Sequence, residues 1–385
     1  MTNPNDLFAG KPESFSMTKP SQIELHYAVA TFLLLGLVSH DAFASKDYLV
    51  TAARPDLVFV VDAKERKVVK SHRIPGSSLG NSPITLVPSR DGRTAYVIHN
   101  RWETVSGIDL ESGKEVFRAE LSGGDIRGKA PFGMDLSPDG KELAVYVNPT
   151  QLLPGEYRVR DPFIAIYSTD AGVDAEPVRR LDAPRRVSTL AYAPDGGTLY
   201  AFSWDMLKLD PQTGVLKGKH PWRSWRHGDQ GEPDTLALWP QWEQSNIFAT
   251  PYYVPHTKKS KSDPSFLRAG IWMLDMENDR VKFKEFENAR VVLFSTVVNP
   301  IRRDETYTVY TQLTRVNTKT GKMDRVDLDH TYYNINVSSD GSELYIGGTQ
   351  GDIAVYDSKT LKPLGKIRTP SGGDQVLTSL RVVRR

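Results

Sequence analysis

The sequence predicts an all-β protein, a seven-bladed β-propeller whose ring is closed when a C-terminal strand completes the first blade. Three observations predict this fold: a hairpin motif that recurs along the chain, a strand-and-loop motif that occurs seven times, and a C-terminal strand with no repeat behind it. Both motifs begin after residue 45, so residues 45–385 are expected to form a single propeller domain.

The hairpin motif is an apolar alternating stretch, then a tight turn, then a second short strand. Pro or Ser comes shortly before an Asp-Gly pair, where Pro presets φ, Asp caps its own backbone and Gly accepts a positive φ. The copies contain Asp91-Gly92, Asp139-Gly140, Asp195-Gly196 and Asp340-Gly341, and a degenerate copy contains Asn299-Pro300. Each copy predicts a β-hairpin.

The strand-and-loop motif is a strand that ends in a polar residue and is followed by a short loop, usually with Gly. Its seven copies end at Asp62, Asp109, Tyr167, Asp210, Asp275, Asn317 and Asp357. The span from residue 62 to residue 357 is 295 residues, which is about 49 residues for each of the six intervals. Periods of roughly 40–50 residues made of short strands are typical of propellers with four strands per blade.

The two ends of the repeat array complement each other. Residues 377–383 resemble an innermost strand with no repeat behind it, and residues 48–61 supply middle strands with no innermost strand ahead of them. The C-terminal segment can therefore complete the first blade, which removes the open edge between the first and last blades. An array of β-sandwiches in two domains is the alternative.

The N-terminal 44 residues are expected to be a signal segment that is removed on export. Residues 27–38 are uncharged and apolar, about as long as the hydrophobic region of a signal peptide and too short to span a bilayer. The small-x-small sequence that follows predicts cleavage after Ala44. Met17 is an alternative translation start, because residues 1–26 contain only two basic residues. A buried N-terminal helix is the alternative to export.

The chain contains no cysteine, which excludes several kinds of chemistry. Structural disulfides, a Cys-based zinc site, a nucleophilic thiol and covalent attachment of a c-type haem all require that residue. The formal net charge is only +2, so the composition gives no case for a nucleic-acid or acidic-membrane partner. Because no disulfide can form, a large hydrophobic core must stabilise the fold.

Aromatic residues and strand-entry loops supply the candidate site residues. Six of the seven tryptophans fall within 69 positions, and loop aromatics favour protein interfaces or apolar ligand walls. The stretches that lead into the innermost strands converge on one mouth of the central channel. The candidates for a pocket or a subunit interface are Asn81, Phe132, Arg186, Trp239, Tyr252, Phe294, Tyr332 and Tyr333. Packing between blades or along the channel is the alternative for each.

The histidines do not predict a metal site. His220 and His227 lie seven residues apart near Asp229, but no third or fourth ligand stands at a useful spacing. Surface loop histidines are the favoured interpretation. No catalytic, cofactor-binding or metal-ligating residue is assigned in this chain.

Several runs, in the same order along the chain, resemble the β subunit of quinohemoprotein amine dehydrogenase. They are residues 183–187, 249–253, 294–300, 331–341 and 347–357. The likeness extends from about residue 47 to the C-terminus.

The resemblance implies a periplasmic heterotrimer that oxidatively deaminates primary amines. In this family a small γ subunit carries a cysteine tryptophylquinone and the catalytic carboxylate. An α subunit, a diheme cytochrome c, carries two c-type haems, and the complex passes electrons to a periplasmic acceptor. The β subunit has no cofactor, encloses the quinone-bearing subunit and shapes the amine pocket. A chain without cysteine agrees with that role.

Two other functions fit the sequence. One is a stand-alone periplasmic propeller that acts as a binding or scaffolding protein. The other is the heavy chain of a tryptophan tryptophylquinone amine dehydrogenase, which is also a propeller without a cofactor. For the leading interpretation, replacing Tyr332 or Phe294 by Ala is expected to change amine preference more than stability.

Overall fold

The computed structural model describes residues 45–78, 82–236, 241–370, 373–375 and 380–385. The predicted signal segment, with its alternative start at Met17 and its cleavage site after Ala44, lies outside the described residues. Residues 46–385 form one compact unit. Helix in the described ranges is limited to one 3-10 turn, η2 (Gly172–Asp174). No helix among these residues is long and apolar enough to cross a membrane.

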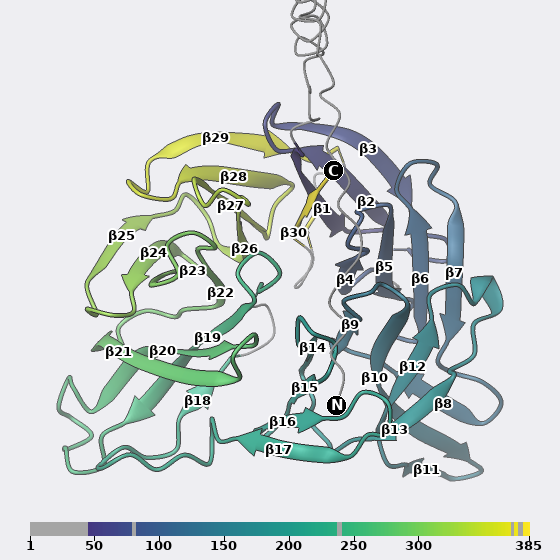
Figure 1. The fold of residues 1–385 in the computed structure, drawn as a ribbon, viewed down its shortest axis with the longest axis horizontal. Helices are drawn as coiled ribbons and strands as arrows, with labels where there is room; N and C mark the ends of the chain where they lie inside the picture. Colours follow the sequence, from purple (N-terminus) through teal and green to yellow (C-terminus); the bar gives the residue numbers. More distant parts are fainter. Residues whose placement is uncertain (1–44, 79–81, 237–240, 371–372, 376–379) are drawn as a thin grey trace, which may run out of the picture. The chain divides into compact units, whose positions relative to one another are not determined.

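The described strands form seven sheets arranged in a ring (Figure 1), so the predicted seven-bladed propeller is confirmed. Blade 1 contains β1 (Asp47–Ala53), β2 (Leu57–Asp62), β3 (Lys67–Arg73) and β30 (Arg381–Arg384). Blade 2 contains β4 (Thr85–Pro88), β5 (Thr94–His99), β6 (Thr104–Asp109) and β7 (Glu115–Glu120). Blade 3 contains β8 (Ile126–Lys129), β9 (Met134–Leu136), β10 (Glu142–Leu153), β11 (Glu156–Val159), β12 (Phe163–Ser168) and β13 (Arg179–Asp182).

The other four blades each have four strands. Blade 4 contains β14 (Thr189–Tyr192), β15 (Leu199–Phe202), β16 (Met206–Leu209) and β17 (Leu216–His220). Blade 5 contains β18 (Asp234–Thr235), β19 (Ile247–Pro255), β20 (Leu267–Asp275) and β21 (Arg280–Asn288). Blade 6 contains β22 (Ser295–Val298), β23 (Glu305–Val309), β24 (Gln312–Asn317) and β25 (Met323–Asp327). Blade 7 contains β26 (Tyr332–Val337), β27 (Glu343–Gly348), β28 (Asp352–Asp357) and β29 (Pro363–Arg368).

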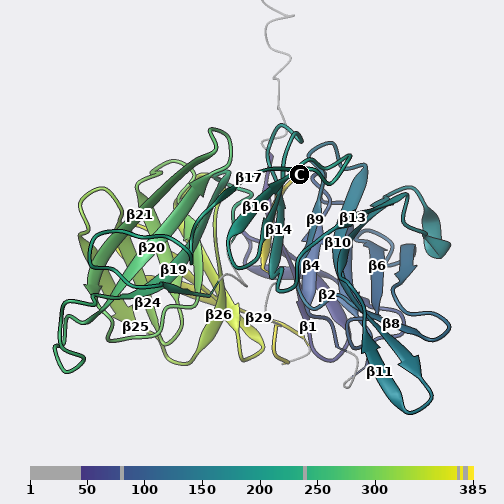
Figure 2. The ribbon, with the colours of Figure 1, turned by 90° about the horizontal axis from the view of Figure 1, so that it is seen from below.

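The antiparallel order of the strands gives the ring two distinct faces. The loops that lead into innermost strands and the loops that join second to third strands lie on one face, which we call the entry face. The hairpin turns that contain Asp-Gly lie on the opposite face, which we call the turn face. Blade 3 has an extension on the entry face, where β10 continues past the sheet and pairs with β11 (Figure 2).

The predicted Asp-Gly turns form as expected. In the turn of blade 7, Gly341 has φ +71°, which a residue with a Cβ adopts only under strain. Asp340 accepts the Ser342 N–H at 2.9 Å through its side chain. Ser338 donates its hydroxyl hydrogen to the same carboxylate at 2.6 Å. Local side-chain hydrogen bonds therefore determine the turn, which is why the sequence predicts it well.

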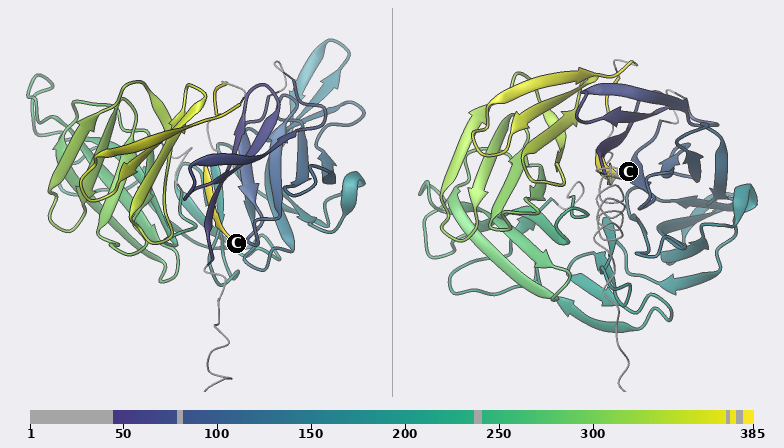
Figure 3. Two further views of the ribbon diagram at one scale, coloured as in Figure 1. Left: turned by 90° about the horizontal axis from the view of Figure 1, so that it is seen from above. Right: turned by 45° about the horizontal axis from the view of Figure 1, so that its top comes forward.

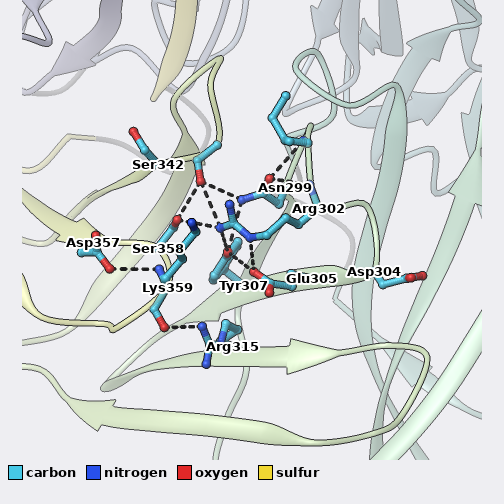
Figure 4. A network of polar contacts seen from close by, with 12 residues as sticks. Asn299, Arg302, Asp304, Glu305, Tyr307, Arg315, Ser342, Asp357, Ser358 and Lys359 are labelled. Carbon is cyan, nitrogen blue, oxygen red and sulfur yellow. Dashed lines mark hydrogen bonds and ion pairs between the residues drawn. The ribbon is translucent and has the colours of Figure 1, made fainter.

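The degenerate turn of blade 6 is stabilised by a polar network instead of a glycine (Figure 4). The Asn299 side chain accepts the Arg302 N–H at 2.9 Å and donates to the Gly341 carbonyl at 2.9 Å. Arg302 donates to Glu305 at 2.8 Å and, in blade 7, to the Ser358 hydroxyl at 2.8 Å. This turn therefore links blade 6 to blade 7.

The C-terminal strand closes the ring as predicted. Strand β30 pairs antiparallel with β1, with Leu49 opposite Val382 and Val50 opposite Arg381. Figure 3 shows this C-terminal strand beside the first strands of the chain. Its side chains pack in both directions, because Val382 joins the core between blades 7 and 1 while Val383 joins the core between blades 1 and 2. The last strand thus contributes to two blade interfaces.

The hydrophobic core of the described chain is divided into seven clusters, one between each pair of neighbouring blades. The cluster between blades 4 and 5 contains four buried tryptophans, which are Trp222, Trp225, Trp242 and Trp272. The sequence left open whether the clustered tryptophans form an interface or a ligand wall, or pack between blades. These four pack between blades. Trp204, by contrast, is 43% exposed on the entry face.

Ring closure predicts a large effect for Leu380→Ala. Leu380 is fully buried between blades 7 and 1. Its truncation is expected to lower the free energy of unfolding by about 2–5 kcal/mol, measured by urea denaturation. Leu364→Ala on the outermost strand β29, where the side chain is 39% exposed, is the control and should cost much less. Equal losses for the two variants would contradict the role of the C-terminal strand.

Candidate functional site

Three aromatic rings from blades 6 and 7 meet on the entry face. Phe294 precedes β22, Tyr310 lies between β23 and β24, and Tyr333 lies in β26. The Phe294 and Tyr310 rings stack with centroids 5.0 Å apart, and the Tyr333 ring is 5.6 Å from Phe294. The Phe294 N–H donates to the Val309 carbonyl at 3.1 Å, which positions the first ring. We call these three half-buried residues the aromatic cluster.

A carboxylate and a guanidinium lie near this cluster. Burial raises the pKa of Tyr333, the Asp374 carboxylate adds to that shift, and Arg54 opposes it. The Arg54 N–H donates to the Asp374 carbonyl at 2.8 Å, so the two residues are held together. The positive charge of Arg54 offsets that of the carboxylate, so the rings themselves make this surface suit a cation with an apolar tail, because ring faces attract cations and apolar surface gains from burial.

The other candidate residues do not join the aromatic cluster. Arg186 is exposed beside Trp204 on blade 4. Phe132 packs against the core between blades 2 and 3, and its carbonyl accepts the Thr85 hydroxyl at 3.2 Å. Asn81 and Trp239 lie outside the described residues. The structure therefore brings together Phe294 and Tyr333 among the predicted residues, with Tyr310, which the sequence had not indicated.

Tyr252 and Tyr332 are core residues. The Tyr252 ring is 1% exposed and packs edge-on against Trp225 at 5.0 Å. The Tyr332 ring is fully buried, and its one hydroxyl hydrogen is shared between Asp329 at 3.1 Å and Asp352 at 3.2 Å. Contrary to the expectation from the sequence, Tyr332→Ala should therefore act first on stability, because it removes a buried ring.

Charged residues of three blades meet in the centre of the ring. Asp135 lies in innermost strand β9, Arg381 in innermost strand β30, and Glu243 in the turn before β19. Arg381 forms an ion pair with Glu243, and its guanidinium lies 5.4 Å from the Trp242 ring centroid. Burial lowers the pKa of Arg381 to about 10, while the Asp135 carboxylate opposes this shift.

The turn of blade 5 crosses the channel near the turn face. Gln244 donates its side-chain N–H to the Val382 carbonyl at 3.0 Å, although blades 5 and 1 are not neighbours in the ring. A cavity of about 220 Å³ beside this crossing is lined by Asp135, Glu243 and Gln244 among others. The sequence signal for this region is a charged residue inside an otherwise apolar innermost strand, as in Met134-Asp135-Leu136. Sequence reasoning missed it.

The two histidines considered as metal ligands lie in different surroundings. His220 lies in β17, the outermost strand of blade 4, and its ring contacts the Asp279 carboxylate of blade 5 at 2.7 Å. The His227 ring packs 5.0 Å from Trp225 and 4.6 Å from Phe283. In the ranges that the structure describes, no group of three or more His, Asp or Glu side chains could hold a metal ion.

Comparison with known proteins supports the fold. No protein-family model matches this sequence, and no curated protein matches it. A functionally unknown protein from Desulfotomaculum acetoxidans is similar in structure, with a TM-score of 0.55 and 13% identity over 88% of this chain and 99% of that one. Kuenenia stuttgartiensis hydrazine synthase is similar with a TM-score of 0.53 and 15% identity, over 82% of this chain and 90% of that one. At these identities the likeness concerns the fold alone.

The two buried tyrosines predict opposite responses to loss of a hydroxyl group. The Tyr252 hydroxyl has no hydrogen-bond partner among the described residues, so Tyr252→Phe should leave the free energy of unfolding unchanged or slightly higher. Tyr332→Phe removes a hydroxyl hydrogen that two carboxylates share and should lower the free energy of unfolding by about 1–3 kcal/mol. Urea denaturation of both variants measures the difference, and a reversed order would contradict these environments.

Asp135 predicts a specific dependence of stability on pH. Burial raises the pKa of its carboxyl group from 3.8 to about 6, although the Tyr192 N–H, which donates to it at 2.7 Å, opposes the shift. The folded protein binds this proton more tightly than the unfolded chain does. The stabilising contribution is therefore complete below about pH 4 and is lost as the pH rises through about 6.

Asp135→Asn should remove this dependence while keeping an oxygen that accepts the Tyr192 N–H. The stability of the variant relative to the wild type is expected to rise by up to about 3 kcal/mol between pH 4 and pH 7. Urea denaturation at several pH values measures this difference, in which groups common to both proteins, such as His99, cancel. Parallel stability curves for the two proteins would show that Asp135 titrates normally.

Proposed function

We propose that this chain is the cofactor-free β subunit of a periplasmic quinohemoprotein amine dehydrogenase. The observation that carries the proposal is the aromatic cluster on the entry face. Two of its three residues, Phe294 and Tyr333, lie in the runs 294–300 and 331–341 that resemble the family. They come from different blades and stand with ring centroids 5.6 Å apart. In this proposal the runs that resemble the family therefore also build one wall of the amine pocket.

The chain contributes a surface rather than a reactive group. A chain without cysteine can form neither the thioether of a cysteine tryptophylquinone nor the covalent bonds of a c-type haem. In the proposed complex these groups belong to a γ subunit and to a diheme α subunit, and the quinone supplies the amine-oxidising chemistry. The complex acts as an oxidoreductase on CH–NH₂ donors and passes electrons to a periplasmic acceptor.

The aromatic cluster can discriminate between amines through their apolar tails. Each buried methylene group of an alkylamine contributes about 0.8 kcal/mol. The ring faces attract the ammonium group. Removal of one ring should therefore matter more for long amines than for short ones.

A stand-alone periplasmic scaffold is the second candidate function. The observation that favours it is the turn of blade 5, which crosses the channel through the contact between Gln244 and Val382. Because this turn occupies the channel near the turn face, we place binding on the loops of the entry face. Loops held on a rigid scaffold often carry binding residues.

The composition of the native assembly tests the proposal. The protein purified from its native periplasm is expected to carry haem absorbance and a quinone-bearing small chain, in constant ratio through a second column. A monomer that has neither group would favour the scaffold function. This measurement needs no variant, so protein stability does not affect its outcome.

Phe294→Ala is expected to change amine preference in the purified complex. Its kcat/KM should fall by about fourfold for each methylene group that loses contact, so the loss grows along an alkylamine series. Phe283→Ala is the control, because that ring lies on outermost strand β21 and is 38% exposed. Unchanged kinetic constants along the whole series would remove Phe294 from the amine pocket.

A further inference from the structure

A second surface cavity lies on the entry face at blades 4 and 5, away from the aromatic cluster of blades 6 and 7. It has a volume of about 250 Å³ and is lined mainly by cationic, aromatic and hydroxyl side chains. Arg186 comes from the loop that enters blade 4, Trp204 from the loop between β15 and β16, and Arg223 from the loop after β17. Three separate loops therefore build one wall.

Two guanidinium groups lie over one indole ring in this cavity. The guanidinium carbon of Arg186 is 5.4 Å from the Trp204 ring centroid, and that of Arg223 is 5.5 Å from it. Arg186 adopts φ +72°, a conformation that is uncommon for a residue with a side chain. The backbone there is held in an unfavourable region while the cationic side chain remains exposed beside the ring.

Hydrogen bonds and a salt bridge with neighbouring residues fix the loop that carries Trp204. The buried Trp222 indole N–H donates to the Trp204 carbonyl at 2.7 Å. Asp205, which is 6% exposed, accepts the Ser224 N–H at 3.1 Å and forms a salt bridge with Lys219 at 3.3 Å. These contacts hold the backbone of the loop that carries the Trp204 ring, and such preorganisation lowers the entropic cost of binding.

Donor groups in the cavity lack acceptors. In the described part of the chain, the Arg186 guanidinium has no hydrogen bond or ion pair, and its contact is the Trp204 ring. Thr235 is 7% exposed, and its hydroxyl also has no hydrogen-bond partner among the described residues. Arg223 donates to the Thr235 carbonyl at 3.0 Å, and its acidic neighbour Asp234, at 3.4 Å, is 81% exposed. Among the described residues the cavity thus has two unused donors, the Arg186 guanidinium and the Thr235 hydroxyl, and two cationic side chains.

We propose that this cavity binds a carboxylate group. A guanidinium fork matches the planar geometry of a carboxylate, and charge-assisted hydrogen bonds of this kind are stronger than neutral ones. The Thr235 hydroxyl is an additional donor, and Trp204 offers an apolar surface for the stem that carries the carboxylate. The same positive charge repels an ammonium group, so this cavity differs in chemistry from the proposed amine pocket.

The carboxylate can come from a small free molecule or from an acidic side chain of a protein partner. The inference goes beyond the proposed function, because binding at blades 4 and 5 requires neither a quinone nor a haem. Amine kinetics and the content of haem and quinone test the proposed function separately. Failure of one proposal is therefore distinguishable from failure of the other.

Benzoate is the probe for a free carboxylate, and benzamide is its neutral isostere. Isothermal titration of the purified protein, in the assembly in which it purifies, should show saturable binding of benzoate and not of benzamide. Arg186→Gln should weaken benzoate binding by at least about tenfold. Arg290→Gln removes an exposed arginine from the loop that enters blade 6 and is the matched control, which should bind as the wild type does.

A partner's carboxylate gives a different pattern. If the cavity is already filled by an acidic side chain of a co-purifying chain, benzoate will not bind. Arg186→Gln should then lower the salt concentration at which the partner dissociates, whereas Arg290→Gln should leave it unchanged. If the protein purifies alone, the benzoate titration decides by itself.

The result that overturns the proposal is the absence of both effects in correctly folded variants. Unchanged thermal unfolding and near-ultraviolet circular dichroism establish that Arg186→Gln is folded, which is expected because the side chain is exposed. Thr235→Val serves as a second variant, since it keeps the shape of the side chain and removes the unused hydroxyl. Benzoate binding that is equal in all variants would place the probe elsewhere on the molecule.

Discussion

The pairing of β30 with β1 is the interaction on which the rest of this structure depends. A blade of the ring is stable only when it has a neighbour on each side, because its two faces are apolar. The C-terminal strand supplies the innermost position of blade 1, and its side chains enter the clusters toward blades 7 and 2. The pairing therefore joins the two ends of the chain and leaves no open edge between the first and last blades.

Ring closure has a particular importance because the chain has no disulfide to constrain it. Stability must come from burial between blades, and the seven interblade clusters of the described chain provide it. Where the turn of blade 6 lacks an Asp-Gly pair, Asn299 and Arg302 replace it with hydrogen bonds to blade 7. The same residues that shape this turn also fasten two blades together.

The entry face has two regions of different chemistry. At blades 6 and 7 three aromatic rings meet beside one carboxylate and one guanidinium, and ring faces attract cations while apolar surface favours an apolar tail. At blades 4 and 5 two arginines lie over Trp204, which favours an anion. Both regions lie on the entry face, because their residues come from loops that lead into innermost strands, from the start of such a strand, or from loops that join second to third strands.

The sequence by itself determined the features that follow from local rules. Asp340 and Gly341 mark a hairpin because their own backbone and side chains form the turn, and regular spacing of such signals predicts seven blades. The unmatched strand at the C-terminus was visible for the same reason, since alternation of apolar residues is a local property. These signals were sufficient for the architecture and for the manner of its closure.

Only the tertiary structure decided which side chains are available for function. Tyr332 and Tyr333 are adjacent in sequence, yet one is buried with its hydroxyl on two carboxylates and the other joins the aromatic cluster. Trp222 and Trp204 likewise separate into core and surface. The physical reason is that exposure depends on what a neighbouring blade places against each residue, and those contacts join residues far apart in the chain. A local sequence pattern cannot predict contacts between residues that are far apart in the chain.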